Sequence, residues 1–566
     1  MIRRILRRLP LLLWFVPGFL LWASFPPMGE RMDVFFALAP ILWFARHNSP
    51  GRSFRCWFMN GLFFWVATLS WMPVIVKNGG PWPLVVLGWG ALAAYCALYF
   101  GVFGWLSANV WRFTRTRNYA WRMGALLVAE PILWAGLEII RSRFGGGFAW
   151  NQLGVAPVNG GLGGPAALGG VYLVSALVVL VNGTFASIAE RMLAQFFPGD
   201  DGAAGVPRWA RSVETLVPLM LVLGVYRASS AEFSARRRAA EEGREVDALA
   251  AGLVQRNFPC VFKSAEEDDP VDVYKSLFSV LAHAKPDVLV LPESALCEFG
   301  SVDSRNASAF AEFAQRETGA RAVIAGGLRR EGGREYNSSV LYQKGAQFYD
   351  KVHLVPFGEF IPGDKWITAL QKLAPVGSCT PGELKTLDLV LREGGEPVKL
   401  GVAICYEDTD SAQMRELARM GAEALVFITN DSWFSESIEA EQHAWQAVAR
   451  AIETGLPVMR AGNSGVTGVV RPDGGFRWLS DASGLPVVDS RGTMCEGVAV
   501  VRRPGATPYA RVGDAPIFTL FLLLITAMGM IQYTFNRRNR SLMPVTGAAD
   551  AETNVEPEEK YTTEES

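Results

Sequence analysis

The sequence has little charge, and the two signs are balanced. Only 19% of its 566 residues are Asp, Glu, Lys or Arg, and the formal net charge is −1. Proteins that bind nucleic acid carry a basic surface, often with interleaved aromatic residues, and no such stripe is present here. We therefore expect no nucleic acid partner.

Cysteine is also scarce, with seven in the whole chain. None of their spacings is typical of a zinc or iron–sulfur site, so we expect no metal and no cofactor. If Cys405 is a free thiol, four other cysteines outside the long apolar runs allow three disulfide pairings, among which the sequence does not choose. These four are Cys260, Cys297, Cys379 and Cys495.

Apolar residues, in contrast, are abundant: half the chain is hydrophobic, with 18 Trp and 34 Phe. A helix needs about 20 mostly apolar residues to cross a bilayer. Six segments fit, namely residues 54–75, 82–110, 120–140, 169–189, 208–226 and 515–533. Residues 11–25 and 32–44 are shorter and complete a predicted set of eight spans. Four arginines precede the first, so a signal peptide is an alternative there, but no small-residue cleavage site follows.

The short loops between these segments alternate between rich and poor in arginine. Cytoplasmic loops carry the excess of Lys and Arg, so this alternation fixes the orientation. It predicts both termini in the cytoplasm and residues 227–514 outside, which in a bacterium is the periplasmic face of the inner membrane. The rich side carries Arg3, Arg4, Arg7, Arg8, Arg46, Arg52, Arg55, Arg112, Arg115, Arg117, Arg191, Arg208, Arg537, Arg538 and Arg540.

Four regions follow from this pattern. Residues 1–226 are expected to hold seven spans, residues 227–514 a soluble-type domain, residues 515–533 the last span, and residues 534–566 an acidic, disordered cytoplasmic tail. From residue 271 onward, short Val-, Ile- and Leu-rich runs alternate with helical segments. The expected strands include residues 287–291, 322–327, 399–404, 424–429 and 458–460, and the expected helices are residues 271–284, 307–318, 412–421 and 440–453. This alternation, with later strands separated by turns, predicts an α/β domain with a sheet-rich sandwich.

Three short segments of the exterior region each place a reactive side chain at the end of an apolar run. Glu293 follows Val-Leu-Val-Leu-Pro, Lys351 precedes Val-His-Leu-Val-Pro-Phe-Gly, and Cys405 follows Leu-Gly-Val-Ala-Ile. A thiol nucleophile needs a base, and the oxyanion that forms on attack needs a positive or N–H-donating neighbour. The three residues together predict covalent acyl transfer through a thioester. Taken singly, each also fits an ordinary role: a buried structural Cys, a loop carboxylate and a surface Lys.

Other polar side chains are candidates for a supporting role. Glu359 lies on the Lys351 loop, where it can bond Lys351 or Glu293 and fix their geometry, and Asn337 is a candidate for the pocket wall. Tyr406 and Glu407 follow the nucleophile directly. Two histidines, His353 and His443, raise the alternative of a Cys–His pair, although the helical pattern around His443 favours a structural role.

The glycine-rich run of residues 160–170 has glycines at phosphate-loop-like spacing, but it lacks the preceding strand and the Lys-Ser/Thr ending. We expect a flexible loop at the membrane surface there. Residues 150–170 and 351–361 together are expected to form a mobile apolar cover that keeps water from the thioester.

The three segments resemble the nitrilase, or carbon–nitrogen hydrolase, superfamily, whose members share a Glu–Lys–Cys triad on an αββα sandwich. Within it, the eight predicted spans and several further motifs resemble the bacterial apolipoprotein N-acyltransferase family. The motifs are residues 351–362, 401–407, 429–434, 450–453 and 460–465. The resemblance implies Glu293 as base, Lys351 as oxyanion stabiliser and Cys405 as nucleophile, with Glu359 as a supporting carboxylate.

The resemblance also implies the reaction and its partners. A membrane phospholipid would donate an acyl chain, and the acceptor would be the α-amino group of the diacylglyceryl-cysteine that begins an apolipoprotein. Two alternatives are a membrane-tethered amidohydrolase acting on a small amide and a transporter or scaffold without catalysis. Against transport, the predicted spans hold almost no ionisable residues apart from Glu130, Glu138 and end positions.

Overall fold

The computed structural model describes residues 10–115, 117–196, 208–243, 246–259, 269–361 and 378–541. Contacts within the chain divide it into two units, residues 1–521 and 522–566. The helices, sheets and site described below belong to the first unit, apart from the far part of helix α17. Of the acidic tail, residues 542–566 lie outside the described residues, as does Cys260.

Each of the eight predicted spans falls on a helix. Within the described residues, five helical segments are long and apolar enough to cross a membrane: Trp82–Thr114, Tyr119–Arg141, Ala166–Leu193, Ser212–Arg238 and Ala515–Thr534. They correspond to α6 (Trp82–Thr114), α7 with α8 (Tyr119–Gly124 and Glu130–Arg141), α10 (Ala166–Phe196), α11 (Arg208–Gly243) and α17 (Ala515–Ser541). The other three fall on the shorter or more polar helices α2 (Pro10–Ala23), α3 with α4 (Val34–Ala37 and Ala39–His47) and α5 (Pro50–Thr68).

Helix α11 does not stop where its apolar run ends. The sequence suggested a border between regions at residue 226, but the helix continues to Gly243 and the first strand begins at Val246. The residues that follow Tyr226 are rich in Ala, Arg and Glu, all strong helix formers, so the helix extends as a polar segment. Strand β1, which begins at Val246, was not predicted from the sequence.

The region that follows α11 contains two six-stranded sheets. The first has the strand order β12-β1-β2-β3-β4-β5 and the second β11-β10-β9-β8-β7-β6. The first consists of β1 (Val246–Gln255), β2 (Val288–Val290), β3 (Ala322–Glu331), β4 (Arg334–Tyr342), β5 (Ala346–Asp350) and β12 (Gly492–Val501). The second consists of β6 (Thr386–Leu389), β7 (Val398–Ile404), β8 (Ala424–Thr429), β9 (Val458–Gly462), β10 (Gly468–Val470) and β11 (Phe476–Trp478).

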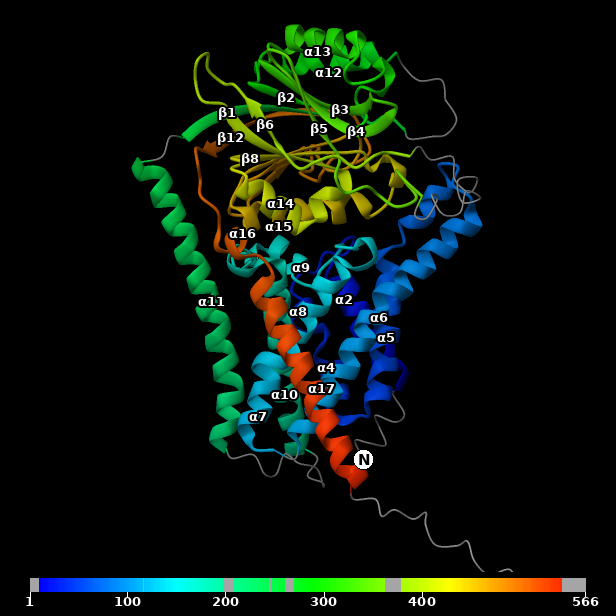
Figure 1. Ribbon diagram of the computed structural model, residues 1–566, viewed down its shortest axis with the longest axis vertical. Helices are drawn as coiled ribbons and strands as arrows, with labels where there is room; N and C mark the ends of the chain where they lie inside the picture. Colours follow the sequence, from blue (N-terminus) through cyan, green and yellow to red (C-terminus); the bar gives the residue numbers. More distant parts are fainter. Residues whose placement is uncertain are drawn as a thin grey trace, which may run out of the picture. The chain divides into compact units, whose positions relative to one another are not determined.

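The two sheets pack face to face with helices on the outside (Figure 1). One buried apolar cluster joins side chains of both sheets, including Val290, Val402 and Val426. A second cluster joins the first sheet to α12 (Pro270–Leu281) and α13 (Arg305–Thr318), and a third joins the second sheet to α14 (Ser411–Arg419) and α15 (Glu439–Thr454). The predicted αββα sandwich is confirmed.

The outer helix layer of the second sheet packs directly on the apolar helical region. The cluster that contains Val448 and Ile452 of α15 also contains Val158 and Ala167 from the glycine-rich segment and the start of α10. Trp150 is also buried. Residues 155–162 form short helical turns, α9 (Val155–Pro157) and η4 (Val158–Leu162). The prediction of a flexible loop and mobile cover is wrong for this segment, because its apolar side chains are built into the core.

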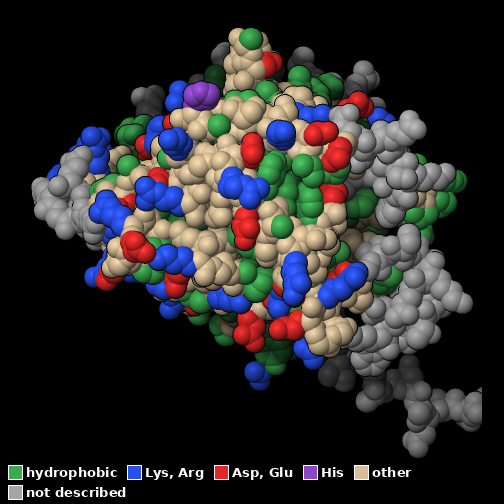
Figure 2. Space-filling model, turned by 90° about the horizontal axis from the view of Figure 1, so that it is seen from above, with side chains coloured by type: hydrophobic (Ala, Val, Ile, Leu, Met, Phe, Trp, Pro, Cys, Tyr) green, Lys and Arg blue, Asp and Glu red, His purple; other side chains and the backbone are tan. Residues whose placement is uncertain are grey.

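The surface seen from above carries both signs of charge. Lys and Arg side chains alternate there with Asp and Glu, and small apolar areas lie among them (Figure 2). This mixture agrees with the balanced composition.

Candidate active site

The three reactive side chains predicted from sequence all lie directly after strands. Glu293 comes three residues after β2, while Lys351 follows β5 and Cys405 follows β7 immediately. In the first sheet, β2 is parallel to β3, and β5 reaches the same direction through two antiparallel pairings. The carboxyl ends of β2 and β5 therefore meet at one edge of that sheet, and Cys405 faces them from the second sheet.

Four polar side chains form a hydrogen-bonded chain at this edge. Asn337 Nδ2 donates to Glu293 Oε1 at 2.7 Å and to Glu359 Oε1 at 2.6 Å. Lys351 Nζ donates to the same Glu359 oxygen at 2.9 Å. The second Glu359 oxygen accepts from the backbone N–H of Val355 at 2.8 Å. Glu359 thus contacts Lys351 directly and Glu293 through Asn337, in agreement with the geometry expected from sequence.

The surroundings change the acidity of the first two reactive groups. Burial raises the pKa of Glu293, and the charge of Lys351 opposes that rise. Burial alone would lower the pKa of Lys351, but the carboxylates of Glu359 and Glu293 raise it above its usual value. Lys351 is therefore a permanent cation, and Glu293 is a carboxylate with more than ordinary basicity, as a general base requires.

Cys405 occupies a strained position at the start of a short 3₁₀ turn, η8 (Cys405–Thr409). Its φ is 54°, a left-handed value that costs a residue other than glycine of order 1–3 kcal/mol. Burial raises the pKa of its thiol well above the usual value; the charge of Glu293 adds to the rise and that of Lys351 opposes it. The thiol is thus neutral at rest and needs the neighbouring base before it can attack.

Glu407 joins the turn that Cys405 begins to the loop that carries Lys351. It accepts hydrogen bonds from the backbone N–H groups of Ile404 at 2.9 Å, Val352 at 2.8 Å and His353 at 3.0 Å, and from the Tyr349 hydroxyl at 3.0 Å. The carboxylate is fully buried. It connects the end of β7, directly before Cys405, to the loop that carries Lys351, and so fixes the two segments relative to each other.

Tyr406 points away from the triad, toward the apolar helical region. Its hydroxyl accepts from the Ala149 N–H at 3.2 Å, and its ring stacks on Trp150 and Phe148 with interplanar angles of 8° and 15°. The residue after Cys405 is therefore embedded in the loop that follows α8.

Neither histidine is placed as the partner of Cys405. His353 Nε2 lies 3.1 Å from the Gly146 carbonyl oxygen, with Asp410 on its other side. His443 is buried between Asp408 and Asp431, whose carboxylates raise its pKa to about 10 although burial alone would lower it. The structural role favoured for His443 agrees with these contacts.

Asp431, Glu439 and His443 form the one group of three side chains in the described residues whose ligand atoms lie close enough to hold a metal, within 4.8 Å of one another. A metal binds neutral imidazole, whereas His443 is held protonated here, and Arg460 already contacts Asp431. The sequence did not indicate that this cluster lies close to Cys405. Asp431 accepts a hydrogen bond from Thr429, and Thr429 affects the pKa of Cys405. The one available signal was the polar run directly after β8.

The remaining cysteines with described positions are free thiols. Cys297, Cys379 and Cys495 form no disulfide. Cys379 lies near the site, since its backbone N–H donates to the Glu359 carbonyl oxygen at 2.9 Å.

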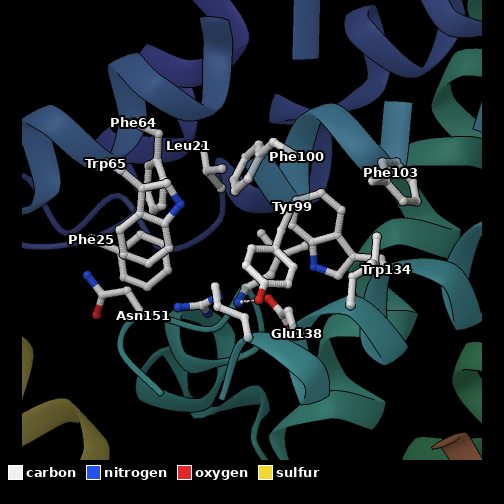
Figure 3. A pocket seen from close by; sticks show the side chains of 13 residues that line it. Leu21, Phe25, Phe64, Trp65, Tyr99, Phe100, Phe103, Trp134, Glu138 and Asn151 are labelled. Atoms are coloured by element: carbon white, nitrogen blue, oxygen red, sulfur yellow. Dashed lines mark hydrogen bonds between the residues drawn. The ribbon is translucent and has the colours of Figure 1, made fainter. Parts of the chain in front are cut away.

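An apolar pocket lies in the helical region, among α2, α5, α6 and α8 (Figure 3). Aromatic rings form most of its wall, including those of Phe25, Phe64, Phe100 and Trp134. Its polar lining consists of Tyr99, Glu138, Arg141 and Asn151. Arg141 donates to the carbonyl oxygens of Phe148 and Trp150 at 2.8 and 2.9 Å, so the residue that lines the pocket also holds the loop that stacks on Tyr406.

Family models match both the helical region and the two-sheet domain of this chain. The family model for the apolipoprotein N-acyltransferase N-terminal domain matches residues 17–184, and the model for carbon-nitrogen hydrolase matches residues 250–489. A variant of an amidase of the nitrilase superfamily from Nesterenkonia AN1 aligns with a TM-score of 0.34 and 18% identity, covering 48% of this chain and 95% of its own.

Full-length relatives extend the match over most of the chain. The apolipoprotein N-acyltransferase of Geobacter metallireducens is 30% identical, covering 86% of this chain and 90% of its own length. The protein of the same name from Methylococcus capsulatus is 28% identical and covers 94% of this chain and 97% of its own length. With a helical region and a carbon–nitrogen hydrolase domain in the same order, this chain belongs to the apolipoprotein N-acyltransferase family.

Proposed function

We propose that this protein transfers an acyl chain from a membrane phospholipid, through a thioester on Cys405, to the α-amino group of the diacylglyceryl-cysteine that begins an apolipoprotein. The observation that carries the proposal is the convergence of Glu293, Lys351 and Glu359 on Cys405, whose next residue is stacked into the apolar helical region. A nitrilase-like triad is thus held against helices suited to a bilayer.

In the first half-reaction, Glu293 takes the thiol proton and Cys405 attacks the ester carbonyl carbon of the phospholipid. Lys351 faces the oxyanion that forms and stabilises it as a fixed positive charge. Collapse breaks the ester C–O bond, and the leaving lysophospholipid oxygen takes the proton back from Glu293. The products are a lysophospholipid and an acyl thioester.

In the second half-reaction, the neutral amine of the acceptor attacks the thioester carbonyl carbon. Glu293 accepts the amine proton, the C–S bond breaks, and the sulfur leaves as a thiolate that regains a proton. The thioester conserves acyl reactivity, so no further energy source is needed. Both substrates carry lipid chains, and extracting these into water would cost about 0.8 kcal/mol per CH₂ group, which explains why the catalytic domain is built onto membrane helices.

The proposal includes a topology. Eight helices cross the inner membrane of a bacterium, seven before the catalytic domain and one after it, and the catalytic domain faces the periplasm. The support is the alternation of arginine-rich and arginine-poor loops together with the helices found at each predicted span. Residues 1–226, 227–514, 515–533 and 534–566 are the corresponding regions, with a polar extension of α11 beyond residue 226.

The principal alternative is an amidase that acts on a small soluble amide with the same triad. The stacking of Tyr406 on Trp150 and Phe148, together with the burial of residues 150–158, favours a lipid substrate, because a soluble amidase has no need of this contact. The test uses the purified full chain with a phospholipid whose acyl chain is labelled and a diacylated peptide amine. Label in an N-acylated peptide supports the proposal. Release of ammonia from small amides without labelled peptide contradicts it.

A further inference from the structure

Thr429 is the last residue of β8, and the sheet register places it beside the nucleophile. β8 runs parallel to β7, and Ile428 pairs with Ile404, so the next residues along the two strands are Thr429 and Cys405. Thr429 is completely buried, and hydrogen bonding by its hydroxyl opposes the rise in the pKa of the Cys405 thiol. A side chain with no role in the proposed mechanism therefore lies beside the reacting sulfur.

The same hydroxyl has a second partner. Thr429 Oγ1 donates to Asp431 Oδ1 at 2.7 Å. Asp431 also accepts from two cations, His443 through Nδ1 at 2.9 Å and Arg460 through Nη2 at 3.2 Å. Because these two partners satisfy the carboxylate, Asp431 stays paired when the hydroxyl proton points elsewhere.

The carboxylate itself is fixed in place. His443 and Arg460 both also contact Asp408, at 3.0 and 2.6 Å, and all four side chains are buried. Asp408 lies in the turn that Cys405 begins. The network thus holds the end of β8 and the nucleophile turn at a constant separation, and it leaves one part free to move, the hydroxyl hydrogen of Thr429.

We propose that the Thr429 hydroxyl is the hydrogen-bond donor to the Cys405 thiolate, turning from Asp431 to the sulfur when the thiol proton passes to Glu293. This inference rests on the proposed role of Cys405 as nucleophile. The rotation is about the Cβ–Oγ bond and moves a single hydrogen, and the β-branched side chain keeps the oxygen in place. Thr429 makes and breaks no covalent bond, and its own proton stays on its oxygen.

The donor acts in both half-reactions. It stabilises the thiolate before attack on the phospholipid ester, and it stabilises the sulfur again when the amine displaces it from the thioester. A hydrogen bond from Thr429 also counteracts the surroundings of the sulfur. Burial and the charges of Glu293 and Asp431 all raise the pKa of Cys405 and so disfavour the thiolate. A hydroxyl that bonds both Asp431 and the sulfur separates two groups that repel when both are negative.

The experiment compares Thr429→Val, which keeps the shape and removes the hydroxyl, with Thr429→Ser, which keeps the hydroxyl. Thr318→Val is the matched control, because Thr318 is equally buried and donates only to the Ala314 carbonyl oxygen of its own helix. The full chain is purified in detergent, and alkylation of Cys405 by iodoacetamide is followed between pH 6 and 10 by mass spectrometry of the peptide that contains it.

We expect Thr429→Val to alkylate about tenfold more slowly at every pH in this range, because a smaller fraction of its Cys405 is thiolate. Thr429→Ser and Thr318→Val should follow the unmodified protein. An unchanged profile for Thr429→Val would overturn the proposal, and so would a loss in Thr429→Val that Thr429→Ser shares, since that assigns the residue to packing. Alkylation needs no lipid, so its outcome is distinct from the test of Cys405 as nucleophile, which is the acyl adduct itself.

Discussion

Lys351 and Glu359 form a buried ion pair, with Nζ 2.9 Å from Oε1 and side-chain exposures of 1% and 13%. The pair keeps a permanent cation at the end of β5, where the proposed oxyanion forms. A buried charge without a partner costs several kcal/mol, so the position of Lys351 depends on Glu359. In the proposed mechanism, Glu359 therefore holds Lys351 in place without taking part in bond making.

Replacement of Glu359 by Gln should slow formation of the acyl-enzyme about tenfold without abolishing it. Gln keeps the size and a carbonyl oxygen that can accept from Lys351 or Asn337, but it removes the charge that holds Lys351. The measurement is the rate of thioester accumulation with phospholipid alone. Glu331→Gln, at an exposed ion pair with Arg329, serves as control and should show the native rate. Complete loss of thioester in Glu359→Gln would assign Glu359 a direct chemical role.

Replacement of Glu293 by Gln should stop acyl-enzyme formation, because an amide cannot accept the thiol proton. Asn337 can still bond the new side chain through its carbonyl oxygen, so the loop geometry should persist. The assay is thioester accumulation followed by a chase with a diacylated peptide amine. His353→Gln should retain the reaction. Native-rate thioester formation in Glu293→Gln would move the role of base to another group, with His353 the first to test.

The pH dependence of acylation should show the raised pKa of Glu293. Glu293 acts only when ionised, and burial raises its pKa above the ordinary value of about 4.3. The rate should therefore fall as the pH drops through this raised pKa, and it should rise toward neutral pH as the carboxylate forms. Initial rates of thioester formation between pH 4.5 and 8 give the acid limb. An acid limb whose midpoint lies at or below about pH 4.3 would show that no carboxyl group with a raised pKa controls the step.

Glu407→Gln should destabilise the protein by about 3 kcal/mol, because the new amide places an N–H group against donors that the carboxylate satisfied. Three of these are the backbone N–H groups of Val352, His353 and Ile404. Thermal unfolding in detergent should show a midpoint lower by several degrees. Glu312→Gln, on the exposed face of α13, should leave it unchanged. Equal midpoints for the two variants would contradict the positioning role of Glu407.

The proposed topology can be tested with two lysines on opposite sides. A membrane-impermeant amine reagent should label Lys344, whose side chain is 73% exposed, in intact spheroplasts. Lys560 of the acidic tail should be labelled only after permeabilisation, and Lys344→Arg should remove the label from the peptide that contains residue 344. Labelling of Lys560 alone in intact spheroplasts would reverse the orientation and place the catalytic domain in the cytoplasm.

Much of the fold could be predicted from local pattern. The strands at 399–404 and 424–429 and the helix at 440–453 were expected within one or two residues, because short apolar runs between amphipathic helices are distinctive. Strands β1, β4, β5, β6 and β11 escaped prediction. The residues of β4 and β5 are more polar, all five strands pair antiparallel with a neighbour, and these partners are set by the sheets rather than by the local sequence.

The contacts within the site could be predicted less well than the identities of its residues. Sequence placed Glu293, Lys351 and Cys405 at strand ends, but it did not show that Asn337 joins Glu293 to Glu359 or that Glu407 bonds the loop of Lys351. These links join residues far apart in the chain and exist only after the two sheets pack. The embedding of Tyr406 among aromatic side chains also depends on the packing of α15 against the helical region.

The most direct test of the central claim is the mass of the peptide that contains Cys405 after incubation of the full chain with phospholipid alone. The account predicts a fatty acyl thioester on Cys405 that hydroxylamine cleaves and that a diacylated peptide amine removes as an N-acyl product. Cys405→Ala should carry no adduct, and Cys405→Ser at most a trace, because a hydroxyl has a much higher pKa than a thiol. A normal acyl adduct in Cys405→Ala, or N-acylated peptide formed by that variant at the native rate, would contradict the account.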